Sequence, residues 1–259
     1  MFSKTCNMNP FMGRIGGKKL LKKQIVDKYF PKGYKDMTYV EPFVGGGSIF
    51  FYKEPSAYEV INDLDKVVYN IFKGFKKYDG DQISHDINGT YNKVIFKQIL
   101  HSHPRSEYNK FIKNLMVLKT SFFGQGKSYG TKPNINSNYD GKYRERLKHT
   151  IILNKDFKAV IKKYDSPNTF FYLDPPYEES NNLYTHDVVD LNELFKLLNN
   201  IKGLFLMSYN NSSHAKQLFK EYRIRTVNTK YTNPIKGGQN RAKKELLISN
   251  YKNPIHQKP

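Results

Sequence analysis

The chain has 259 residues, of which 38% are hydrophobic and 15% aromatic, enough for one large packed domain with a smaller inserted one. Its formal net charge is +20, which favours a polyanionic partner such as nucleic acid. A genome rich in A and T would also produce such a lysine-rich composition, so the charge alone leaves both interpretations open.

The composition also disfavours several classes of protein. No apolar run is as long as a membrane helix requires, and the N-terminus lacks the apolar core of a signal peptide, so we expect neither a membrane protein nor a secreted one. The single cysteine, Cys6, excludes a disulfide framework and a cysteine-based zinc site, and it fits a reducing compartment. We expect no metal and infer no obligate protein partner.

The N-terminal part begins with residues 1–12, which have no clear periodicity and are expected to form a loose arm. A glycine-rich basic segment follows, Gly13-Arg14-Ile15-Gly16-Gly17-Lys18-Lys19, and leads into an amphipathic helix that ends before Pro31. A glycine loop at a helix N-terminus offers unpaired N–H groups to an anion such as a carboxylate. A simple flexible turn is the alternative.

A predicted strand over residues 37–40 runs into a second glycine-rich loop, Glu41-Pro42-Phe43-Val44-Gly45-Gly46-Gly47-Ser48. Such a loop lets a ligand lie against bare backbone where a strand turns into a helix. The next predicted strand, 58–61, is followed by Asp63, at the spacing where an acidic residue binds ribose hydroxyls in nucleoside-binding βαβ units. Alternatively, Asp63 caps the helix predicted over residues 67–78.

Strand–helix alternation lapses between residues 74 and 143. Apolar periodicity predicts helices over residues 91–100 and 108–122, and the stretch after them, 124–143, is polar, basic and rich in glycine and tyrosine. We interpret the helices as a small subdomain and the basic, tyrosine-containing stretch as a functional loop that contacts nucleic acid, with disorder as the alternative. The expected DNA contacts in this loop are Lys127, Tyr129, Lys132 and Asn134.

The third predicted strand, 150–153, precedes Asp156 and Phe157. At the end of a strand near a ligand, Asp156 could accept a hydrogen bond from an adenine amine while Phe157 packs on the ring. Capping of the following helix by Asp156 is an equally good interpretation.

The most informative stretch is the apolar strand 170–173, which stops at Asp174-Pro175-Pro176-Tyr177. Neither proline can donate to a sheet, so the strand must end there, at the edge where open α/β sheets bind ligands. A flat molecule with an exocyclic amine suits this corner: Asp174 and the Pro175 carbonyl accept its two N–H bonds, and Tyr177 stacks on the ring. The alternative is a proline-rich turn in which Asp174 only caps the next helix.

The C-terminal part begins with a polar stretch, 178–187, whose length suits a lid. A helix starting at Asp190, a buried strand over 204–208 and paired strands over 224–229 and 245–249 follow. The last two strands flank a basic hairpin tip, 233–244, in which Lys236, Arg241, Lys243 and Lys244 are expected to contact DNA. A solvated charged loop is the alternative.

Four segments, 11–23, 39–51, 61–65 and 171–177, resemble in the same order the Dam-type DNA adenine methyltransferases, the amino-group methyltransferases with an Asp-Pro-Pro-Tyr motif. The resemblance is closest at Val40-Glu41-Pro42-Phe43-Val44-Gly45. It implies a site-specific enzyme that transfers methyl from S-adenosylmethionine to adenine N6 in double-stranded DNA, with base flipping. The alternatives are an RNA adenine methyltransferase and a catalytically silent DNA-binding relative.

The resemblance also implies the architecture: an α/β, Rossmann-like methyltransferase sheet with an inserted helical target-recognition subdomain. We predict a catalytic domain over residues 1–73 and 144–259 and the subdomain over 74–143. By motif match Lys18, Asp63 and Asp174 contact the cofactor; so does Arg14, where the family usually has an aromatic residue. The remaining predicted cofactor contacts are Gly16, Gly17, Glu41, Phe43, Gly45, Gly47, Asp156 and Phe157.

Overall fold

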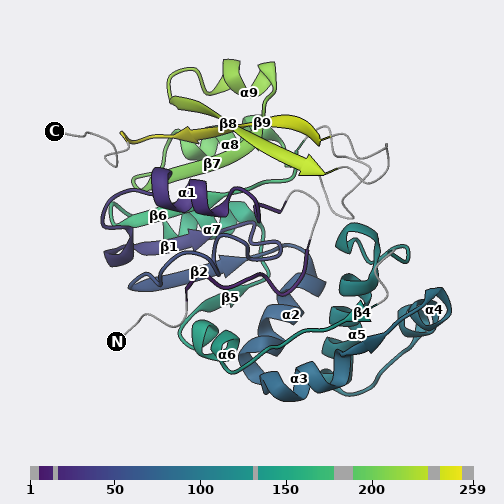
Figure 1. Ribbon diagram of the computed structural model, residues 1–259. Helices are drawn as coiled ribbons and strands as arrows, with labels where there is room; N and C mark the ends of the chain where they lie inside the picture. The colour runs from purple at the N-terminus through teal and green to yellow at the C-terminus, as the bar shows by residue number, and fades with distance from the viewer. Residues whose placement is uncertain (1–5, 14–16, 131–133, 178–188, 233–239, 253–259) are drawn as a thin grey trace.

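The computed structural model describes residues 6–13, 17–130, 134–177, 189–232 and 240–252. Its centre is a seven-stranded sheet in the order β5-β2-β1-β6-β7-β9-β8 (Figure 1). The strands are β1 (Thr38–Glu41), β2 (Tyr58–Asn62), β5 (Ile151–Leu153), β6 (Thr169–Leu173), β7 (Leu204–Asn210), β8 (Arg223–Thr232) and β9 (Asn240–Ser249).

The first five strands of this order run parallel, and β9 and β8 are added antiparallel at one edge. The parallel strands are apolar on both faces, as strands covered on both sides must be. Successive side chains of β6 alternate between the two cores: Phe170 and Tyr172 belong to one, Phe171 and Leu173 to the other. A single buried strand therefore joins both halves of the core.

Helices cover the two faces. Residues of α1 (Lys22–Tyr29) and α2 (Lys66–Lys77) pack in one core, and residues of α7 (Phe157–Tyr164), α8 (Leu191–Leu198) and α9 (Ser213–Leu218) pack in the other. A short 3₁₀ turn, η1 (Tyr34–Asp36), leads into β1. None of the helices in the described ranges is long and apolar enough to cross a membrane.

Residues 74–143 hold most of the remaining elements: α3 (Gly80–Ile87), α4 (Lys93–His101), α5 (Glu107–Thr120), η2 (Phe122–Gly124) and a two-stranded pair of β3 (Gly89–Thr90) with β4 (Asn134–Ile135). The chain then returns to the sheet through α6 (Lys142–Leu147). Figure 1 shows α3, α4 and α5 grouped beside α2, beyond the β5 end of the sheet. The predicted α/β fold with a helical insertion is confirmed; the exact domain boundaries stay a prediction.

Two expectations were wrong. The N-terminal arm is not loose where it is described: Phe11 is 1% exposed, and its ring stacks on Phe75 with centroids 3.7 Å apart. The C-terminal hairpin is also longer than predicted, because β8 and β9 stay paired from Arg223↔Ser249 to Thr232↔Asn240. Much of the predicted basic tip is therefore strand.

Candidate active site

A cavity of about 370 Å³ opens at the carboxyl ends of β1, β2 and β6. It is bounded by the glycine loop (residues 45–48), by Asp63 after β2, by the start of α7 and by the Asp174–Tyr177 corner after β6. Among the described residues, seven carboxyl side chains and three lysines line it, an acidic excess in a chain whose net charge is +20. The carboxyl side chains are Glu41, Asp63, Asp65, Asp156, Asp174, Asp190 and Glu193.

Only one oxygen of the Asp174 carboxylate, Oδ1, has partners among the described residues. Its Oδ1 accepts a hydrogen bond from Ser208 Oγ at 2.9 Å and pairs with Lys18 Nζ at 2.7 Å. Its Oδ2 has no hydrogen-bond partner among the described residues, and the side chain is 20% exposed. The corner therefore presents a fixed carboxylate with one oxygen open toward the cavity that Asp174, Pro175, Pro176 and Tyr177 line together.

Lys18 lies within this corner. Besides Asp174, its ammonium donates to the Tyr177 hydroxyl at 3.1 Å and lies 3.7 Å from Glu245 Oε2. The side chain is buried, which acts to lower its pKa, but the neighbouring Asp174, Tyr177 and Glu245 outweigh that effect and raise the pKa well above its usual value. Lys18 is therefore a permanent cation beside the Asp-Pro-Pro-Tyr motif, and it also lines the cavity as predicted.

The Tyr177 ring is placed by its neighbours. It packs edge-on against Tyr209 at the end of β7, with ring centroids 5.1 Å apart and planes at 64°. Burial raises the pKa of Tyr177 well above its usual value, so the phenol stays neutral. The two rings form an aromatic wall next to the open oxygen of Asp174.

The glycine loop adopts conformations that require glycine. Gly45 and Gly47 have φ of 51° and 76°, in the left-handed region that other residues rarely adopt. A Cβ on Gly46 would lie 2.9 Å from the Met12 carbonyl oxygen, so the N-terminal arm packs directly on the loop. The predicted close approach of backbone to ligand fits this geometry.

Asp63 is tied to the glycine loop. Its Oδ2 accepts from the Gly45 N–H at 2.8 Å, and its Oδ1 accepts from the Asp65 N–H at 2.9 Å. The cap of α2 is Asp65, which accepts from the Val67 N–H at 2.8 Å, so the interpretation of Asp63 as the helix cap was wrong. Asp63 also lines the cavity.

Asp156 and Phe157 both line the cavity, but Asp156 is also the N-cap of α7, accepting from the Lys158 N–H at 2.7 Å. The capping alternative for Asp156 is thus confirmed. Phe157 faces Phe43 with ring centroids 5.3 Å apart, so the two predicted residues form an aromatic pair at the cavity wall.

Glu41 is a buried carboxyl at the cavity wall. It is 2% exposed, and its Oε2 accepts a hydrogen bond from the Tyr39 hydroxyl at 2.6 Å. Burial raises the pKa of Glu41 to about 8. At neutral pH this group is therefore largely protonated when the cavity holds no cation.

The predicted DNA-contacting residues are not gathered in one place. Lys127 and Asn134 are exposed, whereas the Tyr129 hydroxyl donates to the Tyr91 carbonyl at 2.6 Å and holds its own loop in place. Arg241, Lys243 and Lys244 lie in strand β9 rather than in the hairpin tip, because the paired strands extend past them. Arg14, Gly16, Lys132, Lys236 and the lid stretch 178–187 lie outside the described residues.

Three site residues were missed by the sequence analysis. Ser208 fixes Asp174, Glu245 lies beside Lys18, and Asn62 bonds the Pro42 carbonyl and the Lys155 backbone through its amide. Ser208 carried a usable signal, since it is the first polar residue after a buried apolar run that ends at the same sheet edge. Glu245 carried none, because its burial depends on the pairing of β9 with β7, which the sequence does not show.

Sequence comparison identifies the family. The profile of the D12 class N6 adenine-specific DNA methyltransferases matches residues 15–114 and 90–233. The chain belongs to this family. It is a site-specific DNA methyltransferase that acts on adenine N6, with S-adenosylmethionine as the methyl donor. The predicted activity, substrate class and cofactor are confirmed.

Two of the individual relatives align with nearly the whole chain, and a third aligns with about two thirds of it. The type II methyltransferase M1.LlaDCHI of Lactococcus lactis subsp. cremoris is 27% identical, with 95% of this chain and 97% of the relative covered. M.MjaIII of Methanocaldococcus jannaschii is 26% identical, with 94% and 99% covered. M.CviBI of Paramecium bursaria Chlorella virus NC1A is 25% identical over 66% of this chain and 70% of the relative.

The cavity of this methyltransferase fits S-adenosylmethionine in charge and in shape. The acidic lining suits a sulfonium cation, the Phe43–Phe157 pair suits a purine ring, and Asp63 offers acceptors to ribose hydroxyls. The bare backbone of the glycine loop leaves room beside them.

Proposed function

We propose that the Asp174–Tyr177 corner binds the target adenine and that the adjoining cavity holds the cofactor. The observation that supports this most directly is the asymmetric Asp174 carboxylate, with Oδ1 held by Lys18 and Ser208 and Oδ2 open toward the cavity. The open oxygen and the Pro175 carbonyl are two acceptors, matching the two hydrogens of an exocyclic amine.

The corner prepares the amine for transfer. Adenine N6 is a poor nucleophile because its lone pair is delocalised into the ring. Two acceptors in fixed positions favour a more pyramidal nitrogen with its lone pair directed toward the cavity. S-adenosylmethionine, when bound, supplies a methyl group activated by its sulfonium. The protein's contribution is alignment and desolvation, in which the rigid Lys18–Asp174–Ser208 arrangement avoids rearrangement during the reaction.

We assign cofactor binding to residues that follow the carboxyl ends of three neighbouring strands, β1, β2 and β5. Asp63 lines the cavity after β2, and its carboxylate oxygens accept from the ribose hydroxyls. The Phe43 and Phe157 rings pack on the purine ring, and the glycine loop follows the remainder of the molecule. Asp156 contributes mainly by fixing the start of α7, which carries Phe157.

The target adenine must leave the base stack to reach this corner. Flipping one base out of duplex DNA costs a few kcal/mol, and stacking on an aromatic ring recovers roughly 1–3 kcal/mol. Tyr177 is the ring in position to do so, because its hydroxyl bond to Lys18 and its contact with Tyr209 fix its plane beside Asp174.

Residues 74–143 and the β8–β9 hairpin are proposed to grip the duplex on either side of the site. In Figure 1 the α4–α5 group and the C-terminal end of β8 lie on the same side of the molecule as the carboxyl ends of β1 and β2. Exposed Lys127 and Lys244 belong to these two regions. The names of the type II relatives agree with modification of a defined site.

Asp174→Asn tests the assignment of the corner. The amide can turn its nitrogen toward N6, where an acceptor is required, so single-turnover methyl transfer to DNA should fall by at least about 100-fold, the scale of losing a positioned electrostatic contact. Cofactor affinity, measured by calorimetry, should change far less. The matched control is Asp81→Asn, an exposed acid on α3, which should keep the wild-type rate. Wild-type transfer by Asp174→Asn would remove Asp174 from the mechanism.

A further inference from the structure

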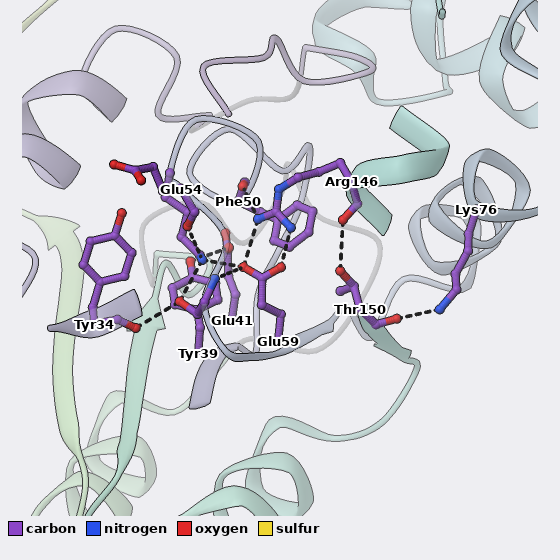
Figure 2. A network of polar contacts seen from close by, with 11 residues as sticks. Tyr34, Tyr39, Glu41, Phe50, Glu54, Glu59, Lys76, Arg146 and Thr150 are labelled. Carbon is purple, nitrogen blue, oxygen red and sulfur yellow. Dashed lines mark hydrogen bonds and ion pairs between the residues drawn. The ribbon is translucent and has the colours of Figure 1, made fainter. Parts of the chain in front are cut away.

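A buried charged network lies directly behind the glycine loop (Figure 2). Its centre is Arg146 on α6, which is 4% exposed. The guanidinium bonds both carboxylate oxygens of Glu59 on β2, and Nη2 lies 2.9 Å from Oε1. The same Nη2 donates to the Phe50 carbonyl at 3.0 Å, while Cζ lies 3.8 Å above the Phe50 ring.

The segment after the glycine loop explains why Phe50 needs this contact. Residues 47–53 form a single turn, closed by the Phe51 N–H to the Gly47 carbonyl and the Lys53 N–H to the Ile49 carbonyl, each at 2.9 Å. Carbonyls at the end of such a turn have no following turn to bond them. Arg146 supplies the donor for Phe50, and Lys53 Nζ supplies one for Glu54 at 3.0 Å.

Glu59 ties the two cations together. Its Oε1 also accepts from Lys53 Nζ at 2.5 Å, and despite burial the two cations hold the pKa of Glu59 below its usual value. Lys53 Nζ lies 4.0 Å from the Tyr39 ring, and the hydroxyl of Tyr39 bonds Glu41 at the cavity wall. The network therefore touches the cavity wall at Glu41 and the loop at Phe50.

We propose that Arg146 is a positioning residue that fixes the glycine loop and thereby sets the affinity for S-adenosylmethionine. The inference rests on the proposed function, which places the cofactor in the cavity. Arg146 is absent from the cavity lining, whereas Ser48 and Ile49, which immediately precede its partner Phe50, line it. Any effect of Arg146 on the cofactor must therefore pass through the loop or through the contacts of Glu59, Lys53 and Tyr39 that lead to Glu41 at the cavity wall.

The cost of burying these charges supports a positioning role. Replacing a buried ion pair by well-packed apolar side chains is often neutral for stability or stabilising, so burial alone gives no reason for a guanidinium here. What an apolar residue lacks is the planar fork that bonds a carboxylate and a carbonyl at once. That property joins three segments: β2, the turn after the glycine loop, and α6, where the chain returns from residues 74–143.

The test compares Arg146→Met and Arg146→Lys with Lys76→Met. Lys76 Nζ donates to the Thr150 carbonyl at 2.8 Å in the same neighbourhood, but it contacts neither Phe50 nor Glu59 (Figure 2). Calorimetry without DNA should show the cofactor Kd raised about tenfold in Arg146→Met and severalfold in Arg146→Lys. A lysine can bond Glu59 but cannot span to Phe50. The control should stay within twofold of wild type even if its Tm falls.

Hydrogen exchange of the ligand-free enzyme gives a second readout that does not depend on the cofactor. Amides of residues 43–53 should exchange faster in both Arg146 variants and at the wild-type rate in Lys76→Met. If Arg146→Met does not fold, Arg146→Lys decides: wild-type Kd and wild-type exchange in a folded variant would overturn the proposal. A different result would show that the cofactor does not bind in this cavity. In that case the Arg146 variants would exchange faster, but Asp63→Ala would bind the cofactor with wild-type affinity.

Discussion

At the scale of single residues, the site combines groups that lie far apart in the sequence. Lys18 reaches Tyr177 across 159 positions, and Ser208 reaches Asp174 across 34. The motif itself could be predicted because all its residues are adjacent and each has a local chemical meaning. The contacts that orient Asp174 could not be predicted, although Lys18 and Ser208 each carried a local signal, because strand order determines which side chains meet Asp174.

Asp63 leads to the first prediction at this scale. Asp63→Ala should weaken cofactor binding by roughly 1–3 kcal/mol, the range for hydrogen bonds to charged groups, because the ribose loses its acceptor. The glycine loop also loses the Gly45 contact, which acts in the same direction. Calorimetric titration with S-adenosylmethionine measures the change.

The matched control for Asp63 is Asp79→Ala. Asp79 caps α3, away from the cavity, by accepting from the Asp81 and Gln82 N–H groups. Losing such a cap costs about 0.5–2 kcal/mol of stability. The control should therefore unfold more easily but bind the cofactor as wild type does. Equal cofactor affinity in Asp63→Ala and wild type would leave Asp63 a purely structural residue.

The raised pKa of Glu41 predicts that the stability of the protein depends on pH. Its pKa is about 8 in the folded protein and near the ordinary 4.5 in the unfolded chain, so the folded state binds more protons between these values. Its contribution to stability is therefore complete below pH about 4.5 and is lost as pH rises toward 8. The loss amounts to at most about 1.4 kcal/mol per pH unit.

Glu41→Gln should remove this dependence. Denaturant unfolding between pH 5 and 8 should show the variant gaining stability relative to wild type as pH rises, since Gln carries no proton to lose. Lys53 also titrates in this region, but it is present in both proteins and largely cancels in the difference. Tyr39→Phe, which removes the hydrogen bond and keeps the carboxyl, should retain the pH dependence. If the free energy of unfolding changes with pH in the same way in Glu41→Gln and in wild type, Glu41 is not neutral in the folded protein.

At the scale of elements, continuous apolar runs were the dependable signal. The predicted strands 58–61 and 170–173 match β2 and β6 to within a residue at each end. The apolar run of β6 is buried on both faces, whereas β2 begins with the exposed Tyr58 and includes the buried, ion-paired Glu59. Helices with a clear apolar stripe, such as α5, were also predicted. The glycine loop was placed correctly because a strand followed by glycines has few alternatives.

Elements without such a signal were missed. Helix α3 is only eight residues long, and it owes its place to Ile83 and Ile87 in the shared core and to its Asp79 cap. The N-terminal arm has no periodicity, yet Phe11 is held by rings from α2 and by Tyr139, all distant in sequence. In both cases tertiary contacts, rather than local propensity, determine the structure.

At the scale of the whole molecule, charge is distributed by function. The chain carries +20 overall, yet acidic groups dominate the cavity. The two partners have opposite charges, a cationic cofactor and polyanionic DNA, so a basic exterior around an acidic cavity serves both.

The last prediction concerns where this exterior meets DNA. Lys127 follows η2 and Lys244 lies in β9, and both are exposed in the two regions proposed to flank the duplex. Each lysine that contacts a phosphate releases counterions, and its loss lowers the slope of log affinity against log salt by about one. Lys202, also exposed, immediately precedes Gly203 and β7, at the amino-terminal edge of the sheet, away from the site.

Neutralising Lys127 and Lys244 together should therefore lower the salt slope by about two and weaken binding to all duplex sequences alike, because phosphate contacts carry no sequence information. Lys202→Ala, which removes one positive charge, should leave the slope unchanged, because Lys202 lies at the opposite edge of the sheet from the site. Fluorescence anisotropy with labelled duplexes over a range of salt concentrations measures both. An unchanged slope in the double variant would show that Lys127 and Lys244 do not contact the DNA. An equal change of slope in Lys202→Ala would show that the lysines act only through net charge.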